Sequence, residues 1–210
     1  MYDFKTVREL YETCYYGDQI QQDSLDEIGL EGWIRTNRNN GSIGFIELND
    51  GTYFKNAQIV YDKEKLNNFE DITHHLTGCS ISIKGKFVLT PNAKQPFEIH
   101  LHEFTLIGDC DSTYPLQKKR HSFEYLRDIA HLRPRTNTFN AVFRLRSVLS
   151  MAIHEFFQNQ GFVYVHTPLL TGISCEGDDM FHVVTGDDKN NLDSYFGKKT
   201  LLSGSGQIHV

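Results

Sequence analysis

The 210-residue sequence lacks a long apolar run, a clustered set of cysteines and an excess of basic residues. No apolar run approaches the length of a membrane-spanning helix, so the composition argues against a membrane protein. The first ten residues mix acidic and basic side chains, which is not typical of a secretory signal peptide. These absences predict a soluble, cytoplasmic protein with no membrane partner.

The cysteines and histidines do not form a recognisable metal motif. The sequence has four widely spaced cysteines: Cys14, Cys79, Cys110 and Cys175. No pair has the spacing of a zinc finger, and the pattern does not indicate a disulfide framework. The adjacent His74 and His75 have no neighbouring cysteine or carboxylate set that would complete a zinc site. The sequence therefore predicts no metal site.

The charge balance restricts how the protein can bind its partners. The net charge is −6, with 39% hydrophobic and 23% charged residues, which is ordinary for a soluble globular protein. A surface coated in basic residues is excluded. A local basic face is still compatible with this charge, because attraction to phosphate depends on where the cations lie.

The first half of the chain has the pattern of a small β-barrel. Apolar residues at intervals of three and four predict a helix over residues 3–15. Three strands, a helix and two strands are then expected at residues 28–35, 42–48, 53–60, 62–75, 80–90 and 97–104. The pair Asp50–Gly51 is typical of a hairpin turn. This order is that of a five-stranded OB-fold, a barrel that binds oligonucleotides.

The second half of the chain differs from the first in composition and in its apolar pattern. Residues 107–136 are polar, contain a basic cluster at 118–121 and predict a short helix at 123–129. A broad apolar stripe then predicts a helix over residues 138–159: Val142, Leu145, Val148, Leu149, Ala152, Ile153, Phe156 and Phe157. Asn137 or Thr138 is expected to cap this helix and Gly161 to end it. Residues 162–166 then read as a strand that stops at Pro168.

Two stretches carry a resemblance to a known family. Residues 32–38 and 44–51 read GWIRTNR and GFIELNDG. They are similar to the anticodon-binding barrel of the aspartyl, asparaginyl and lysyl subclass of class II aminoacyl-tRNA synthetases. Residues 131–139 and 164–168 read HLRPRTNTF and YVHTP, and they resemble the first class-defining motif, with Pro168 as its proline.

Smaller details favour the asparaginyl members of this family. Residues 91–98 (PNAKQPFE), 195–199 (YFGKK) and 205–208 (SGQI) resemble segments of those enzymes. Aspartyl members usually have a proline where Gly206 stands. The resemblance extends from about residue 25 to residue 210, and its motifs taken together are highly specific.

The resemblance implies an α+β architecture in three parts. Residues 1–106 would form the anticodon-binding OB-fold with its N-terminal helix, and residues 107–136 a hinge. Residues 137–210 would begin the antiparallel-sheet catalytic domain with the helix and strand of motif 1. Two interpretations of the hinge are open, a solvated linker or a surface that faces tRNA.

The resemblance also assigns anticodon-reading residues. Phe45 would stack under an anticodon base, although alternation alone leaves a core position for Phe45 equally open. Arg38 and Gln58 match positions that contact the central anticodon uridine, and both side chains can bind base edges. Glu98 matches a position near the first anticodon base. From the residues alone, Glu98 would be read as a surface charge.

Other residues match the amino-acid pocket and the subunit interface. Glu176 would hold the α-amino group by a charge-assisted hydrogen bond, with Gln207 and Ser205 beside the amino acid. Pro168 would lie at a homodimer interface. The loop at 174–181 departs from the family: it is one residue shorter, and Ser174 replaces a common aspartate. Gly204 also stands where a β-branched residue is usual.

The family's reaction is ATP-dependent attachment of asparagine to tRNA-Asn, with Mg²⁺. The arginines that bind ATP in motifs 2 and 3 would lie beyond Val210. We therefore expect this polypeptide alone to bind neither ATP nor Mg²⁺ and not to make asparaginyl-tRNA, which a charging assay on the purified chain would test. A non-catalytic tRNA-binding module and an aspartyl enzyme are the alternatives.

Overall fold

A computed structural model describes residues 3–16, 27–173, 180–184 and 196–210. The chain divides into two compact units, residues 1–145 and 146–210. Among the described residues, no helix is both long and apolar enough to cross a membrane.

The first unit contains a closed barrel. Its strands are β1 (Asp3–Phe4), β2 (Ile28–Asn39), β3 (Ile43–Asn49), β4 (Ala57–Asp62), β5 (Ser80–Leu89) and β6 (Phe97–Gly108). They form a sheet in the order β1-β2-β3-β4-β6-β5, and an additional pairing of β2 with β5 closes it. The pairings of β1 with β2 and of β4 with β6 are parallel, whereas the other pairings are antiparallel. The expected OB-fold is therefore confirmed.

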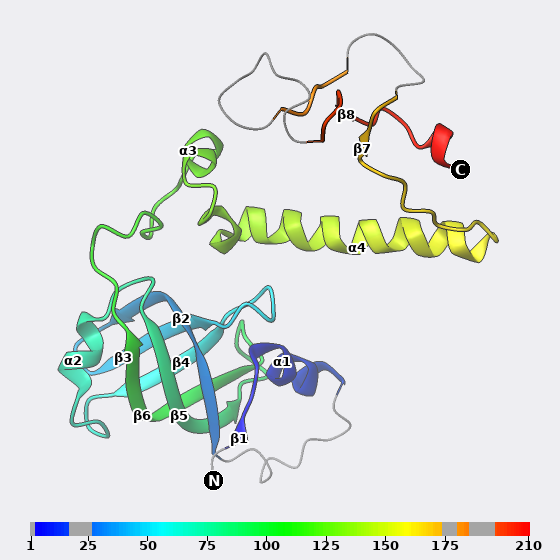
Figure 1. Cartoon of the computed structure of the whole chain (residues 1–210). Coiled ribbons are helices and arrows are strands. Elements are labelled where there is room, and N and C mark those ends of the chain that lie inside the picture. Colours follow the sequence, from blue (N-terminus) through cyan, green and yellow to red (C-terminus); the bar gives the residue numbers. More distant parts are fainter. Residues whose placement is uncertain (1–2, 17–26, 174–179, 185–195) are drawn as a thin grey trace. The chain divides into compact units, whose positions relative to one another are not determined.

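Alternation along the strands builds the barrel interior. β3 and β4 bury every second residue, as the period of two in an extended chain requires. The fully buried aliphatic residues include Leu30, Ile46, Leu48, Ile59, Ile81, Ile83 and Ile99. Two helices add to this core: α1 (Val7–Tyr16) contributes Leu10 and α2 (Phe69–His74) contributes Ile72. They lie at opposite ends of the barrel in the view of Figure 1.

The loop from β3 to β4 is longer than the sequence predicts. β4 begins at Ala57 and not at Tyr53, so a strand over residues 53–56 was a wrong prediction. Asp50 explains the difference, because its Oδ1 accepts a hydrogen bond from the Thr52 amide at 2.9 Å. Its Oδ2 accepts another from the Val7 amide at 2.8 Å, at the start of α1. Tyr53 stacks on Tyr11 of α1, with ring centroids 4.7 Å apart. The loop is therefore used to hold α1 on the barrel.

The end of the first unit contains α3 (Phe123–Asp128), a 3-10 turn (Arg133–Arg135) and the start of α4 (Asn137–Asn159). The short helix expected near residues 123–129 and the long helix are both confirmed. The prediction of Asn137 or Thr138 as the N-cap of α4 was wrong. The capping residue is Thr136, whose hydroxyl accepts a hydrogen bond from the Phe139 amide at 3.4 Å. Asn137 is already helical, so it cannot serve as the cap.

The second unit holds the remainder of α4, β7 (Leu170–Thr171), β8 (Leu201–Leu202) and a 3-10 turn (Gln207–His209). Gly161 follows α4 with φ of 86°, as expected for a residue that ends a helix. The strand expected at residues 162–166 is absent, since no described residue pairs with this segment. Instead the segment packs on its own helix, with the Phe157 and Phe162 rings 5.4 Å apart.

Candidate nucleic-acid interface

The outer face of the barrel carries two neighbouring rows of side chains, the first across five strands and the second across four. The strand registers place Arg38, Phe45, Val60, His100 and Lys86 in the first row. The second row lies two residues along each strand and contains Glu47, Gln58, Glu98 and Val88. Since the pairing of β4 with β6 is parallel, Gln58 falls beside Glu98. All four predicted anticodon residues thus lie on one face.

Phe45 faces outward, which resolves the choice that alternation alone left open. Gly44 and Ile46 are buried in the barrel, whereas Phe45 is only half-buried between them. Arg38 lies directly opposite Phe45 on β2, and its Cζ is 5.3 Å from the centroid of the Phe45 ring. Arg38 is exposed. The pair therefore presents an aromatic ring together with a mobile cation.

Glu98 is the centre of a hydrogen-bonded group and not a solvated surface charge. Its Oε1 accepts hydrogen bonds from Gln58 Nε2 and Gln95 Nε2, both at 2.7 Å. Its Oε2 lies 3.8 Å from His100 Nε2, and the Glu98 side chain is only 19% exposed. Because a carboxylate only accepts, Gln58 must direct its NH₂ group at Glu98. The amide oxygen of Gln58 is consequently oriented away from Glu98.

Arg35 is a basic residue that the sequence analysis did not single out. It lines a cavity of about 1030 Å³ together with Glu47, Lys118, Arg120 and His121, among others. Burial lowers the pKa of Arg35, since desolvation disfavours its charged form. Arginine nevertheless stays protonated at neutral pH. The basic cluster at residues 118–121 thus lines the same cavity as the partly desolvated Arg35. In the sequence, Arg35 could have been noticed as the arginine of the strand motif GWIR.

The candidate amino-acid pocket is described only in part. Glu176 lies outside the described residues. Ser205 accepts a hydrogen bond at its backbone carbonyl from the Ser203 hydroxyl at 2.5 Å, and Gln207 begins the last 3-10 turn. Leu170 pairs with Leu202, which brings residues 203–207 near the segment that contains Pro168. Pro168 itself is exposed.

Gly206 packs closely against the Thr167 side chain. A Cβ at this position would lie 2.8 Å from Cγ2 and 2.9 Å from Oγ1 of Thr167. A proline, which the resemblance associates with aspartyl enzymes, would place its ring against Thr167. The packing around Gly206 therefore leaves little room for a larger residue beside Thr167.

Comparison with known proteins agrees with both halves of the structure. Residues 28–107 match the family of OB-fold nucleic acid binding domains. Residues 122–210 match the class II tRNA synthetases of the D, K and N type. The two matches fall on either side of residues 108–121, which include the whole basic cluster at 118–121.

Curated relatives are asparagine–tRNA ligases. The enzyme of Clostridium acetobutylicum is 54% identical over 193 residues, which are 87% of this chain and 42% of the relative. That of Clostridium novyi is 54% identical over 215 residues, 97% of this chain and 45% of the relative. The chain thus spans less than half the length of these relatives.

A solved structure gives the same result. Asparaginyl-tRNA synthetase from Pyrococcus horikoshii, complexed with asparaginyl-adenylate, superposes with a TM-score of 0.73 at 26% identity. The similarity covers 89% of this chain and 42% of that one. The barrel order, the outer-face residues and these relatives lead to one assignment: the chain belongs to the asparagine–tRNA ligase family of class II aminoacyl-tRNA synthetases.

Proposed function

We propose that this protein acts in the ATP-dependent attachment of asparagine to tRNA-Asn, and that its barrel reads the GUU anticodon. The observation that carries the proposal is the placement of Arg38, Phe45, Gln58 and Glu98 together on one outward face of the barrel. Single-stranded RNA is recognised by stacking on aromatic rings and by hydrogen bonds to base edges, and this face offers both.

An anticodon base competes with Arg38 for the face of Phe45. A cation over an exposed aromatic ring contributes about 0.5–1 kcal/mol. A stacked base contributes roughly 1–3 kcal/mol. The base therefore displaces the guanidinium, which moves outward to contact a base edge or a phosphate. Arg38 thus covers Phe45 in the free protein and becomes a ligand for RNA in the complex.

Glu98 selects the hydrogen-bonding role of Gln58. With its NH₂ group held at 2.7 Å from Glu98, Gln58 offers its amide oxygen as an acceptor. The N3–H donor of uracil satisfies that acceptor, whereas N3 of cytosine carries no proton. The arrangement explains how a flexible amide reads the central uridine.

Removing the aromatic ring should weaken RNA binding. We expect Phe45→Ala to cost about 1–3 kcal/mol in affinity for a GUU anticodon stem-loop, about 5- to 150-fold in Kd. Phe54→Ala is the matched control, since Phe54 is an exposed aromatic residue in the loop before β4. Fluorescence anisotropy at fixed salt measures both. Equal binding of the wild-type chain to a stem-loop with a swapped anticodon would contradict the assignment.

Freeing the Gln58 amide should relax base selection. In Glu98→Gln the partner is no longer an obligate acceptor, so Gln58 can turn and present either end of its amide. We expect the preference for uridine over cytidine at the central position to fall about tenfold, equivalent to about 1.4 kcal/mol. Glu64→Gln makes the same chemical change at an exposed turn of the barrel. An unchanged preference in Glu98→Gln would assign the discrimination to other residues.

The remaining family roles extend this proposal. We place Glu176, Ser205 and Gln207 around the asparagine substrate, which is first activated by ATP with Mg²⁺ and then transferred to the terminal ribose of tRNA. Ser205 and Gln207 are neutral, so they fit an amino-acid amide better than Mg²⁺, and we assign them no role toward ATP. Pro168 and α4 would contribute to a homodimer interface. As a translation enzyme the protein would act in the cytoplasm.

A further inference from the structure

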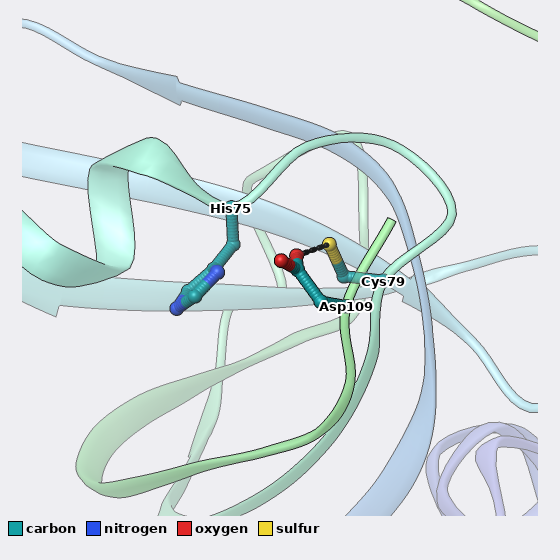
Figure 2. A group of neighbouring side chains, drawn as sticks. All are labelled: His75, Cys79 and Asp109. Carbon is teal, nitrogen blue, oxygen red and sulfur yellow. Dashed lines mark hydrogen bonds between the residues drawn. The ribbon is translucent and has the colours of Figure 1, made fainter. Parts of the chain in front are cut away.

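The fold gathers three side chains that can bind metals and that are not among the outer-face residues. His75 lies at the C-terminal cap of α2, Cys79 just before β5 and Asp109 just after β6. One ligand atom from each lies within 4.8 Å of the others. Figure 2 shows Cys79 and Asp109 facing each other, with the His75 side chain beside them.

Backbone hydrogen bonds fix the three positions. The Ile34 amide donates to the Cys79 carbonyl at 2.9 Å, and the Gly78 amide donates to the Ile34 carbonyl at 2.8 Å. Asn37 Nδ2 donates to the His75 carbonyl at 3.1 Å. Asp109 follows directly on Gly108, which pairs with Ser80 at the end of the β5–β6 ladder. The ligands are therefore held on rigid elements, which favours binding of a small ion.

The side chains are incompletely satisfied in the absence of an ion. The His75 ring stacks on Phe104, with centroids 5.3 Å apart and planes 11° apart, which holds its orientation. His75 Nε2 is shielded from solvent and has no hydrogen-bond partner. The thiol of Cys79 is fully buried and makes two long hydrogen bonds, of 3.5 Å to Asp109 Oδ1 and of 3.8 Å to the Cys110 carbonyl. The first is drawn as the dashed line in Figure 2. A bound ion would replace the long Cys79–Asp109 hydrogen bond with direct bonds to both side chains.

We propose that His75, Cys79 and Asp109 bind one divalent metal ion of the zinc type. Thiolate, imidazole and carboxylate together are the ligands of Zn²⁺, whereas Mg²⁺ and Ca²⁺ prefer oxygen alone. Metal–ligand bonds of about 2.0–2.3 Å place neighbouring ligand atoms about 3.5 Å apart in a tetrahedron. The ligand atoms lie within 4.8 Å of one another, so binding requires the group to contract by about 1 Å. A water molecule or the nearby Cys110 would complete the coordination.

A neighbouring carboxylate supports this assignment. Asp71 Oδ2 lies 3.9 Å from His75 Nε2, so binding through Nδ1 directs the Nε2 hydrogen at a carboxylate, as in many zinc sites. The site is independent of the proposed tRNA function. A bound ion would link the segment after β6 to the end of α2 and to the start of β5.

Cobalt provides a probe of the site in the full chain. After treatment with a chelator and a reductant, we expect Co²⁺ to bind one to one, with a thiolate charge-transfer band and the visible bands of a tetrahedral site. Zn²⁺ should displace it and raise the Tm. Cys79→Ser should abolish the charge-transfer band. His75→Phe, which retains the stack on Phe104, and Asp109→Asn should each weaken Co²⁺ binding at least tenfold.

Cys14→Ser is the matched control, because Cys14 is a partly buried thiol elsewhere in the first unit. It should retain the cobalt spectrum. A wild-type chain with no charge-transfer band at excess Co²⁺ would overturn the proposal, as would a band that survives in Cys79→Ser or disappears in Cys14→Ser. Circular dichroism without metal checks folding. If Cys79→Ser does not fold, unchanged Co²⁺ affinity in both His75→Phe and Asp109→Asn would be decisive against the site.

Discussion

Replacing Gly44 with alanine should destabilise the barrel by about 3 kcal/mol, the upper part of the usual range for overpacking. A Cβ at Gly44 would lie 1.9 Å from Cζ of Tyr61 and 2.3 Å from its Cε1. Tyr61 is fully buried, and its hydroxyl donates to Asn37 Oδ1 at 2.7 Å. Asn37 in turn donates to the Ile72 carbonyl at 2.8 Å. The ring therefore cannot move aside without breaking bonds that join β2, β4 and α2.

Chemical denaturation followed by circular dichroism measures this effect. Gly172→Ala is a suitable control, because a Cβ there would meet its nearest neighbour, the Lys199 carbonyl oxygen, at 3.8 Å. Combining Gly44→Ala with Tyr61→Leu should cost less than the sum of the two single changes, since the smaller side chain removes the clash. Equal stability of Gly44→Ala and the wild-type chain would show that the barrel can open at this point.

The purified 210-residue chain should self-associate through the apolar face of α4. Every residue of the helix from Leu145 onward is exposed. Its large apolar side chains keep about half or more of their surface open to solvent: Leu145 66%, Val148 67%, Leu149 54%, Met151 67%, Ile153 50%, Phe156 59% and Phe157 48%. Phe162 and Val163, in the segment after the helix, are 63% and 84% exposed. Contiguous apolar surface of this kind drives association.

Light scattering over a range of concentrations tests the association. Val148→Glu together with Phe156→Lys introduces opposite charges on the apolar face, and it should shift the chain toward monomer. Ser147→Glu together with Gln158→Lys introduces the same charges at exposed polar positions of the same helix, and it should leave the association intact. A wild-type chain that remains monomeric well above micromolar concentration would refute the prediction.

The amino-acid sequence alone determined the elements whose residues interact locally. Alternation of apolar residues predicted the five barrel strands, and a period near 3.6 predicted α4. The motifs around Trp33 and Pro168 were specific enough to identify the family. These features depend on short stretches of chain, so they can be read without the fold.

Where the prediction of local structure was wrong, a distant contact decided the outcome. The strand expected from Tyr53 became a loop because Tyr53 packs on α1, more than forty positions earlier in the chain. The strand expected at residues 162–166 is missing because β structure requires a pairing partner, which a sequence pattern does not supply. The cap of α4 was misplaced because Thr136, Asn137 and Thr138 can all accept a capping bond.

The chemistry of both candidate sites was decided only by the tertiary structure. Glu98 is separated by 40 residues from Gln58, whose amide it orients, and the parallel pairing of β4 with β6 places them together. The partners of His75 could not be predicted from the sequence. Asp109 is far from His75 in the chain, and the spacing between His75 and Cys79 matches no known metal-binding motif. The antiparallel pairing of β5 with β6 places the end of β6 beside the start of β5, and the three ligand atoms lie within 4.8 Å of one another. Residue types are local properties of the chain, whereas their combination into a site depends on long-range strand pairing.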